Sequence, residues 1–487
     1  MKSKNKQWVL YAFTLIIAAA AVMFFSSTTS PLYPNSYGVD SAFNRFMGLM
    51  IRKGKTLYSE IWDNKGPVLF FLQAIGTLKG THNSDITLTF LMQILSLFFS
   101  VFFLYKAESA ANHQRKSLKL LLPVICAALV FSKVIEGGNL SEEWSLPMIS
   151  CSLYLLVKYA ANIADDPLHP RRYAFIHGIC FSLIAFIRVN NAISICAGLL
   201  AAAIYLIYRK KWQNLLENIL FGLLGISVIA VPVCLYFLKK HALDDMVYGV
   251  FLYNLKYAAQ RTHKTFTGTN LLDRFLPIAA AYVILLAALI RNRWMRLLDW
   301  MLLLIVTANG IMLWSSNIFL HYYIIFVPVL MLILLLYVKF PRVPEILAVL
   351  VVFAFFIAED VQLLSGLPHA KDEPDRFAFG AAIPEDEKDP AMVLYASPAV
   401  YLNTGLIPCS RFAAYHFAHF PVDPSMREEF LNDMQTNQPV WIVFLSGYEG
   451  VIPEVQQMLN DEYYKVHEEY DLAYYRIREN QTFESEK

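Results

Sequence analysis

Residues 215–238 read LLENILFGLLGISVIAVPVCLYFL, and Glu217 is the one charged side chain in this run. An α-helix of this length is about 36 Å long, whereas the hydrocarbon core of a bilayer is about 30 Å thick. A core helix of a soluble protein rarely stays apolar for so long, because one of its faces meets water. The run therefore predicts a membrane-spanning helix.

The composition of the 487-residue chain agrees with this interpretation. Hydrophobic residues make up 57% and charged residues 16%, whereas soluble proteins average about 45–50% and about 25%. The predicted fold class is a mainly α, polytopic membrane protein, and the lipid bilayer is an expected partner. The formal net charge of +2 gives no basic field, so nucleic acid is not expected as a partner. Composition leaves the oligomeric state open.

Eleven apolar runs are long enough to be predicted as spans. They are roughly 7–25, 86–105, 119–136, 145–163, 173–188, 191–208, 215–238, 274–290, 297–314, 321–338 and 343–359. No A-x-A-like cleavage site follows the first run, so we expect it to be a retained signal anchor. No CxxC pair or Cys/His metal spacing occurs, so we expect no structural disulfide and no zinc site.

Basic residues predict the orientation of these spans, because Lys and Arg concentrate in cytoplasmic loops. With the N-terminus inside, the inner loops carry Lys106, Arg115, Lys116, Lys119, Arg171, Arg172, Arg209, Lys210, Lys211, Arg291, Arg293, Arg296, Lys339 and Arg342. The outer turns 137–144 and 315–320 contain no Lys or Arg. The predicted localisation is the cell membrane, with loops 26–85 and 239–272 on the extracytoplasmic side.

Two segments need separate treatment. The apolar run 67–78 would be about 18 Å long as a helix, too short to span, so we expect a juxtamembrane or re-entrant helix on the outer face. The run 173–208 would be about 54 Å long as one helix, and Arg188, Asn190 and Asn191 interrupt it. It is predicted to be a helical hairpin.

The composition changes after the last span, and the chain is divided into a membrane domain, 1–359, and an extracytoplasmic α/β domain, 360–487. Acidic runs such as AKDEPDR are followed by the apolar runs 392–396 and 440–445, which are typical of buried strands. VIPEVQQMLN is predicted to be a helix, and YYKVHEEYDLAYYRI one or two closing strands. We expect this small domain to act as an acceptor-binding element, a lid or a scaffold.

The first outer loop holds the richest polar stretch, YPNSYGVDSAFNRFMGLMIRKGKTLYSEIWDNKGP at 33–67. Residues 41–53 are predicted to form an amphipathic helix with Asp40 near its start, where Asp40 could equally be the N-cap. Asp63 and Lys65 come directly before the apolar run 67–78. Lys65 could snorkel, or it could meet a lipid phosphate.

Three other polar sites are predicted on the outer face. EGGNLSEEWSLP, 136–147, holds Glu142 and Glu143, either solvated or paired around a divalent cation. Arg188 and Asn190 end the fifth span, where an Arg needs a partner or a wet cavity. His321 and Tyr322 begin the tenth span, where an aromatic belt is the alternative explanation. Together these sites suit transfer from a lipid-phosphate donor, with a carboxylate as general base and cations on the leaving phosphate.

The order of these pieces resembles the GT-C class of membrane glycosyltransferases, near bacterial protein O-mannosyltransferases and lipid A aminoarabinose transferases. The pieces are YGVDSAFN, the Gly54–Pro67 segment with WDNKGP, GGNLSEEWSLP, IRVNN and HYYIIFVP. The resemblance implies transfer of a sugar from a polyprenyl-phosphate-linked donor to an extracytoplasmic acceptor such as a cell-surface glycan, lipid or protein, with inversion at the anomeric carbon. A transporter or flippase of lipid-linked glycans and a polysaccharide polymerase or ligase are the alternatives.

The resemblance also implies roles for individual residues. Asp40 and Asp63 would be catalytic, Glu142 or Glu143 the second acidic site, and Lys65, Arg188, Asn190, His321 and Tyr322 donor-phosphate or substrate-binding residues. It leaves open a divalent cation, Mg²⁺ or Mn²⁺, whose ligands would come from Asp40, Asp63, Glu142 and Glu143. Two departures bear on substrate identity: Ser41 follows Asp40 where mannosyltransferases have a second acid, and Lys-Gly-Pro replaces Lys-Pro-Pro.

Overall fold

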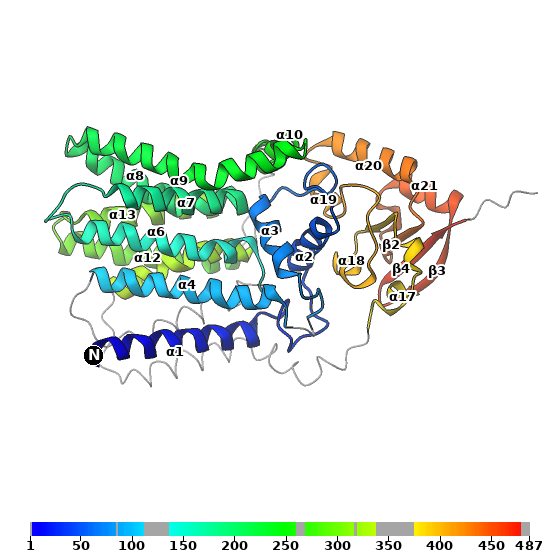
Figure 1. Cartoon of the computed structure of the whole chain (residues 1–487), viewed down its shortest axis with the longest axis horizontal. Coiled ribbons are helices and arrows are strands. Elements are labelled where there is room, and N and C mark those ends of the chain that lie inside the picture. The colour runs from blue at the N-terminus through cyan, green and yellow to red at the C-terminus, as the bar shows by residue number, and fades with distance from the viewer. Residues whose placement is uncertain are drawn as a thin grey trace, which may run out of the picture.

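The computed structural model describes residues 2–83, 86–111, 136–259, 268–315, 319–337 and 375–478. A bundle of long helices forms one half of the molecule, and a smaller α/β part lies beyond one end of this bundle (Figure 1). The bundle helices are α1 (Lys2–Phe25), α4 (Leu88–Ala111), α6 (Ser141–Ala161), α7 (Arg171–Arg188), α8 (Ile193–Tyr208), α9 (Trp212–Lys239), α12 (Gly268–Arg291), α13 (Leu297–Ser315) and α14 (Val327–Tyr337).

The length and apolar composition of its helices identify the bundle as a membrane domain. Within the described ranges, five helical segments are long and apolar enough to cross a bilayer: 8–25, 88–111, 171–208, 212–239 and 297–314. The protein is therefore a multi-pass membrane protein. The predicted spans overlap bundle helices wherever the structure describes them, but the runs 191–208 and 321–338 each begin in a 3₁₀ segment. The run 119–136, apart from Glu136, and the run 343–359 lie outside the described residues, so the number of spans and their orientation stay predictions.

The run 171–208 is broken at its centre, as the interrupting polar residues predict. Arg188 has extended backbone (φ −161°, ψ 113°), and a short 3₁₀ turn, η2 (Val189–Ala192), follows it. The N–H of His169, just before α7, donates to Asn214 near the start of α9 at 2.9 Å. Because α7 and α9 begin side by side, α8, which connects the end of α7 to the start of α9, runs back in the opposite direction to α7. The predicted pair of helices in place of one long helix is confirmed.

Two short helices cap the end of the bundle that faces the α/β part (Figure 1). They are α2 (Val39–Arg52), the predicted amphipathic helix, and α3 (Pro67–Gly76), which starts at a proline as helices often do. Helix α3 is too short to span and packs against α2, in agreement with the prediction for 67–78. Asn139 joins these helices to α6, because its side chain contacts Ser41 at 3.0 Å and Gln73 at 2.8 Å.

The segment after α9 is helical where a long loop was expected. It comprises α10 (Leu243–Val247), the π-helical turn η3 (Tyr248–Leu252) and α11 (Tyr253–Ala259). A 3₁₀ helix, η4 (Leu320–Phe326), precedes α14 and carries His321 and Tyr322. Both segments lie at the same end of the bundle as Arg188.

The α/β part contains a four-stranded sheet in the order β1-β2-β4-β3, with β1 and β2 parallel and the other pairs antiparallel. The predicted strands at 392–396 and 440–445 correspond to β1 and β2, whose side chains are buried because helices cover the sheet. Its elements are α17 (Ala378–Ala381), η6 (Glu385–Glu387), β1 (Ala391–Leu394), α18 (Ala399–Thr404), α19 (His416–His419), α20 (Pro424–Asn437), β2 (Trp441–Leu445), η7 (Glu449–Val451), α21 (Pro453–Glu462), β3 (Tyr463–Glu469) and β4 (Leu472–Ile477). The predicted boundary at 359/360 lies outside the described residues.

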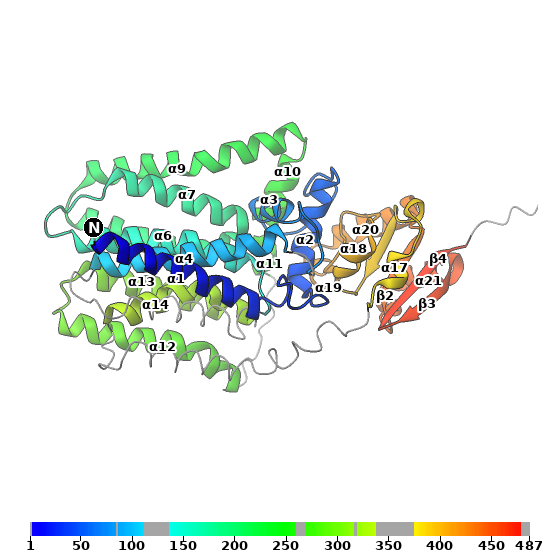
Figure 2. The same cartoon turned by 60° about the horizontal axis from the view of Figure 1, so that its bottom comes forward.

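The α/β part shares a hydrophobic core with the first loop. Phe46 of α2 stacks on Tyr401 of α18 with ring centroids 4.5 Å apart, and the hydroxyl of Tyr37 donates to Asn403 at 2.7 Å. Figure 2 shows α2 between α3 and α18. The helix that carries Asp40 is therefore held from both sides.

Candidate active site

Asp40, Asp63 and Lys65 form one cluster at the start of α2. The Nζ atom of Lys65 lies 3.2 Å from Oδ1 of Asp40 and 3.4 Å from Oδ2 of Asp63. The side chain of Asp40 is 33% exposed and that of Asp63 is 2% exposed, so Asp40 is the acid that a substrate can reach. The alternative of Asp40 as helix N-cap is wrong, because Gly38 occupies that position.

The charges of this cluster keep Asp40 ionised. Burial raises the pKa of Asp40, but the cation of Lys65, the charge of His321 and the hydrogen bonds from Tyr415 and Lys65 outweigh it and lower the pKa to about 2. Burial is the largest cause for Asp63 and raises its pKa, although Lys65 opposes this. The two acids therefore differ: Asp40 is an accessible carboxylate, whereas Asp63 is a buried partner of Lys65.

Tyr415 is a member of this cluster that sequence reasoning missed. Its hydroxyl donates to Oδ1 of Asp40 at 2.9 Å, although the two residues lie 375 positions apart in the chain. Burial, followed by the charges of Asp40 and Asp63, raises the pKa of Tyr415 well above its ordinary value, so the hydroxyl stays a donor. No local pattern around Tyr415 distinguishes it from the other tyrosines of the chain.

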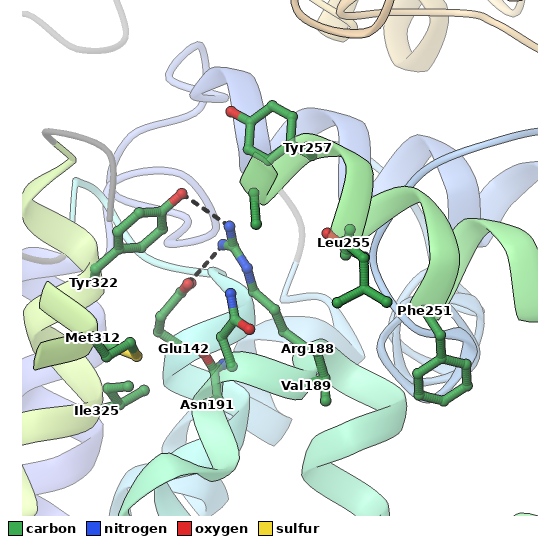
Figure 3. Close-up of a pocket in the computed structure, with 13 residues that line it drawn as sticks. Glu142, Arg188, Val189, Asn191, Phe251, Leu255, Tyr257, Met312, Tyr322 and Ile325 are labelled. Carbon is green, nitrogen blue, oxygen red and sulfur yellow. Dashed lines mark hydrogen bonds and ion pairs between the residues drawn. The ribbon is translucent and has the colours of Figure 1, made fainter. Parts of the chain in front are cut away.

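Arg188 forms a second polar centre beside a cavity (Figure 3). Its Nη1 donates to Oε1 of Glu142 at 2.7 Å, and its Nη2 donates to the hydroxyl of Tyr322 at 2.9 Å. The guanidinium also lies over the Tyr322 ring, 4.8 Å from its centroid. An arginine has five N–H donors, and its contacts with the described residues leave donors for a ligand. The predicted grouping of Arg188, Glu142 and Tyr322 is present in the structure.

The cavity beside Arg188 has a volume of about 550 Å³. Its polar side is formed by Glu142, Arg188 and Tyr322, whereas Leu255 and Ile325 belong to its apolar side (Figure 3). The remaining lining residues are Val189, Asn190, Asn191, Phe251, Asn254, Tyr257, Ala258 and Met312. A cation at one side of an apolar cavity suits a ligand with an anionic head and a hydrocarbon chain.

Glu143 does not share a site with Glu142. Its Oε2 accepts from the backbone N–H of Asn139 at 2.6 Å, and both its carboxylate oxygens accept from Gln93. Glu143 is the third residue of α6, where an acid that reaches back to a preceding N–H stabilises the helix start. The expectation of paired carboxylates around a metal therefore does not fit this geometry, because the two side chains have different partners.

No metal site is formed by three or more His, Cys, Asp or Glu side chains among the described residues. Oδ1 of Asp40 contacts Lys65 and Tyr415, Asp63 contacts Lys65, and Glu142 contacts Arg188. Each predicted carboxylate thus has a protein donor as its partner, and this set does not fit a shared Mg²⁺ or Mn²⁺ ion.

The two remaining predicted residues lie at the edges of the site. His321 is buried, and its Nδ1 lies 3.0 Å from Oε2 of Glu136. Asn190 is exposed and lines the cavity. Its neighbour Asn191 makes the structural contacts, donating to Ser145 at 2.9 Å and to the carbonyl of Ser141.

The Asp63–Gly66 segment connects the two centres. Asn64 and Asn254, which lines the cavity, exchange hydrogen bonds of 3.1 and 2.8 Å. The N–H of Gly66 donates to the carbonyl of Ile187 at 2.9 Å, and a Cβ atom at Gly66 would lie 2.2 Å from the carbonyl oxygen of Phe186. Glycine in the Lys-Gly-Pro segment thus lets Lys65 lie against the end of α7. Arg188 interacts electrostatically with both Asp40 and Lys65.

Comparison with solved structures identifies the class of this fold. ArnT from Cupriavidus metallidurans bound to undecaprenyl phosphate is similar over 97% of this chain and 98% of its own, with a TM-score of 0.59 and 12% identity. ArnT from the same organism in the apo state covers 98% of both chains, with a TM-score of 0.59 and 11% identity. The chain therefore has the fold of ArnT, and this is the fold that the resemblance to the GT-C class implies.

The sequence family is also defined. The chain belongs to the family described as "Putative competence-induced protein Ccs4 N-terminal domain", whose profile matches residues 2–342. Among curated proteins, no sequence matches the chain. The matched range ends before the α/β part, so Tyr415 lies outside it.

Proposed function

We propose that this protein is a membrane glycosyltransferase that moves a sugar from a polyprenyl-phosphate-linked donor to an extracytoplasmic acceptor. The observation that carries the proposal is the presence of two polar centres at the same end of the bundle: the accessible carboxylate Asp40, paired with Lys65, and the cation of Arg188 beside an apolar cavity. The Asp63–Gly66 segment links the two centres. The ArnT structure of the same fold holds undecaprenyl phosphate, which supports a polyprenyl phosphate as the lipid part of the donor.

In the proposed reaction the acceptor hydroxyl attacks the anomeric carbon, and the bond from that carbon to the phosphate oxygen breaks. The configuration inverts because there is one displacement. Asp40 accepts the hydroxyl proton, and Arg188 and Lys65 compensate the negative charge that develops on the polyprenyl phosphate. A carboxylate with a pKa of about 2 is a weak base. It suits a late proton transfer, after the sugar has gained oxocarbenium character and made the hydroxyl acidic.

The proposed role of the apolar wall is to hold the first part of the polyprenyl chain. Leu255 of α11 and Ile325 of η4 face the cavity from different elements (Figure 3). Burial of apolar surface stabilises by about 25 cal/mol per Å², so several isoprene units would contribute much of the donor affinity. The polar centre would then place the phosphate at Arg188.

The test is transfer by the purified full-length chain in nanodiscs, supplied with polyprenyl-phosphate-linked sugars. Asp40→Asn should lower the transfer rate by about 10²- to 10⁴-fold, because the amide cannot accept the proton. Asp386→Asn, at an exposed carboxylate of η6, is the matched control and should act as wild type. An Asp40→Asn variant with the wild-type rate would show that Asp40 is not the base.

The same preparation addresses the alternatives. In proteoliposomes, movement of a lipid-linked glycan between leaflets without sugar transfer would favour the flippase, and chain extension of the lipid-linked glycan would favour the polymerase. Sugar transfer that continues in EDTA is the expected result, because each predicted carboxylate has a protein partner. Loss of activity in EDTA with recovery on Mg²⁺ or Mn²⁺ would contradict this expectation.

A further inference from the structure

The α/β part reaches into the candidate active site through one side chain. Oδ1 of Asp40 accepts from Lys65 at 3.2 Å and from Tyr415 at 2.9 Å. Both contacts with described residues fall on the same carboxylate oxygen. The Tyr415 ring also meets Phe43 edge to face, with centroids 5.0 Å apart, and lies 5.7 Å from Nζ of Lys65. Asp40 is therefore fixed from the α/β side as well as from the first loop.

The backbone at Tyr415 is unusual for a tyrosine. Its φ of 56° and ψ of 28° place it in the left-handed region, which costs a non-glycine residue about 1–2 kcal/mol. Such a conformation persists when its surroundings determine it. Here the N–H groups of Ala418 and His419 both donate to the carbonyl of Tyr415, at 2.8 and 3.1 Å. This conformation directs the ring out of α19 and toward Asp40.

The segment around Tyr415 is anchored on both sides. Before it, Nη1 of Arg411 donates to the carbonyl of Tyr58 at 2.7 Å. After it, Nδ1 of His419 lies 2.7 Å from the hydroxyl of Tyr253, which belongs to α11. Farther along, Asp423 accepts from Lys256 of α11 at 2.9 Å. These contacts tie residues 411–423 to the first loop and to the cavity wall at once.

We propose that Tyr415 is a positioning residue that, together with Lys65, fixes Oδ1 of Asp40 and leaves Oδ2 for the acceptor hydroxyl, so that the α/β part completes the active site. This inference rests on the proposed function. The role is one of geometry, since the base must keep its free oxygen within hydrogen-bond reach of the proton that it accepts. A carboxylate held by Lys65 alone could rotate about its Cβ–Cγ bond.

The kinetic test is the variant Tyr415→Phe in the full-length protein, with the transfer assay described above. Phe keeps the ring contact with Phe43 and removes the donor to Asp40. We expect kcat to fall about tenfold with the donor KM unchanged, equivalent to about 1.4 kcal/mol, because the base is misplaced but the phosphate centre at Arg188 is intact. Tyr37→Phe is the matched control, because Tyr37 also donates between the first loop and the α/β part, to Asn403, without contacting Asp40.

A second measurement is independent of activity. Thermal unfolding of wild type, Asp40→Asn, Tyr415→Phe and the double variant forms a double-mutant cycle. We expect the double variant to lose less stability than the sum of the two single variants, because both remove the same charge-assisted hydrogen bond. Additive losses would overturn the contact, and a kcat for Tyr415→Phe equal to that of wild type or of Tyr37→Phe would overturn the positioning role.

The two proposals can fail separately. If wild type transfers no sugar from any lipid-linked donor, the proposed function fails, and the unfolding cycle alone decides whether Tyr415 holds Asp40. If wild type is active and the cycle shows coupling, but kcat does not depend on Tyr415, the positioning role is rejected while the proposed function stands.

Discussion

Replacement of Arg188 by alanine should have two separable effects. The first is on stability, because Arg188 pairs at 2.7 Å with Glu142, whose side chain is 2% exposed. Removal of one partner of a buried pair costs about 3–5 kcal/mol. Because the Arg188 side chain is 23% exposed, water can reach the vacated position, and we expect about 2–3 kcal/mol.

The second effect is on the donor. If Arg188 binds the donor phosphate, the lost charge-assisted hydrogen bonds are worth about 1.5–3 kcal/mol. The donor KM should then rise about 10- to 100-fold. Adding Glu142→Gln removes the unpaired charge that Arg188→Ala leaves behind. The double variant should therefore regain most of the thermal stability and keep the high KM.

The assay measures the thermal unfolding midpoint and the donor KM for each variant. Arg171→Ala is the control, because Arg171 lies at the other end of α7 and pairs with Glu217 at 2.8 Å while 56% exposed. It should lose under about 1 kcal/mol of stability and leave KM unchanged. Recovery of the wild-type KM in the double variant would refute the phosphate-binding role and reduce Arg188 to a structural partner of Glu142.

Three further substitutions test the surroundings of the site. Gly66→Ala should destabilise the protein by about 1–3 kcal/mol, because its Cβ would lie 2.2 Å from the Phe186 carbonyl oxygen. Gly450→Ala is the control, because its Cβ would lie 3.5 Å from its nearest neighbour and should cost no stability. Equal unfolding midpoints for the two variants would contradict this prediction. Glu143→Gln should lower the unfolding midpoint, because it weakens the hydrogen bond from the N–H of Asn139 just before α6, and it should leave the donor KM unchanged. A raised KM would indicate that Glu143 contributes to donor binding. Burial raises the pKa of Asp423, but hydrogen bonds from Tyr248, Lys256 and Ser425 lower it to about 2, below the ordinary value of 3.8. The ionised Asp423 carboxylate therefore stabilises the fold above pH 3.8, and this stabilisation is lost as the pH falls toward 2. Thermal unfolding from pH 6 to 2 should show this loss in wild type and not in Asp423→Asn, and parallel profiles would argue against it.

Much of the fold could be predicted because its signals are local. The run 215–238 is apolar along its whole length, and α9 covers it. The break at Arg188 was predictable because an arginine and two asparagines interrupt an apolar run that is too long for one crossing. The strands β1 and β2 were predictable from short apolar runs of the kind that a sheet buries on both faces, whereas their parallel pairing was not predicted.

The candidate site was predictable in part. Asp40, Asp63 and Lys65 belong to one loop, and their separation in sequence is small enough for that loop to bring them together. The choice between Glu142 and Glu143 was not predictable, because adjacent residues on a helix start point in different directions about its axis. One meets Arg188 and the other meets the backbone of Asn139.

By itself the sequence determined that this is a multi-pass membrane protein and that Asp40, Asp63 and Lys65 lie in one loop, since hydropathy and residue order need no knowledge of packing. The tertiary structure decided which acid is accessible, which glutamate lines the cavity, and that Tyr415 of the α/β part binds Asp40. These contacts join residues up to 375 positions apart. The physical reason is that a hydrogen bond depends on the final positions of two atoms, and those positions are set by the shared core that packs α18 against α2.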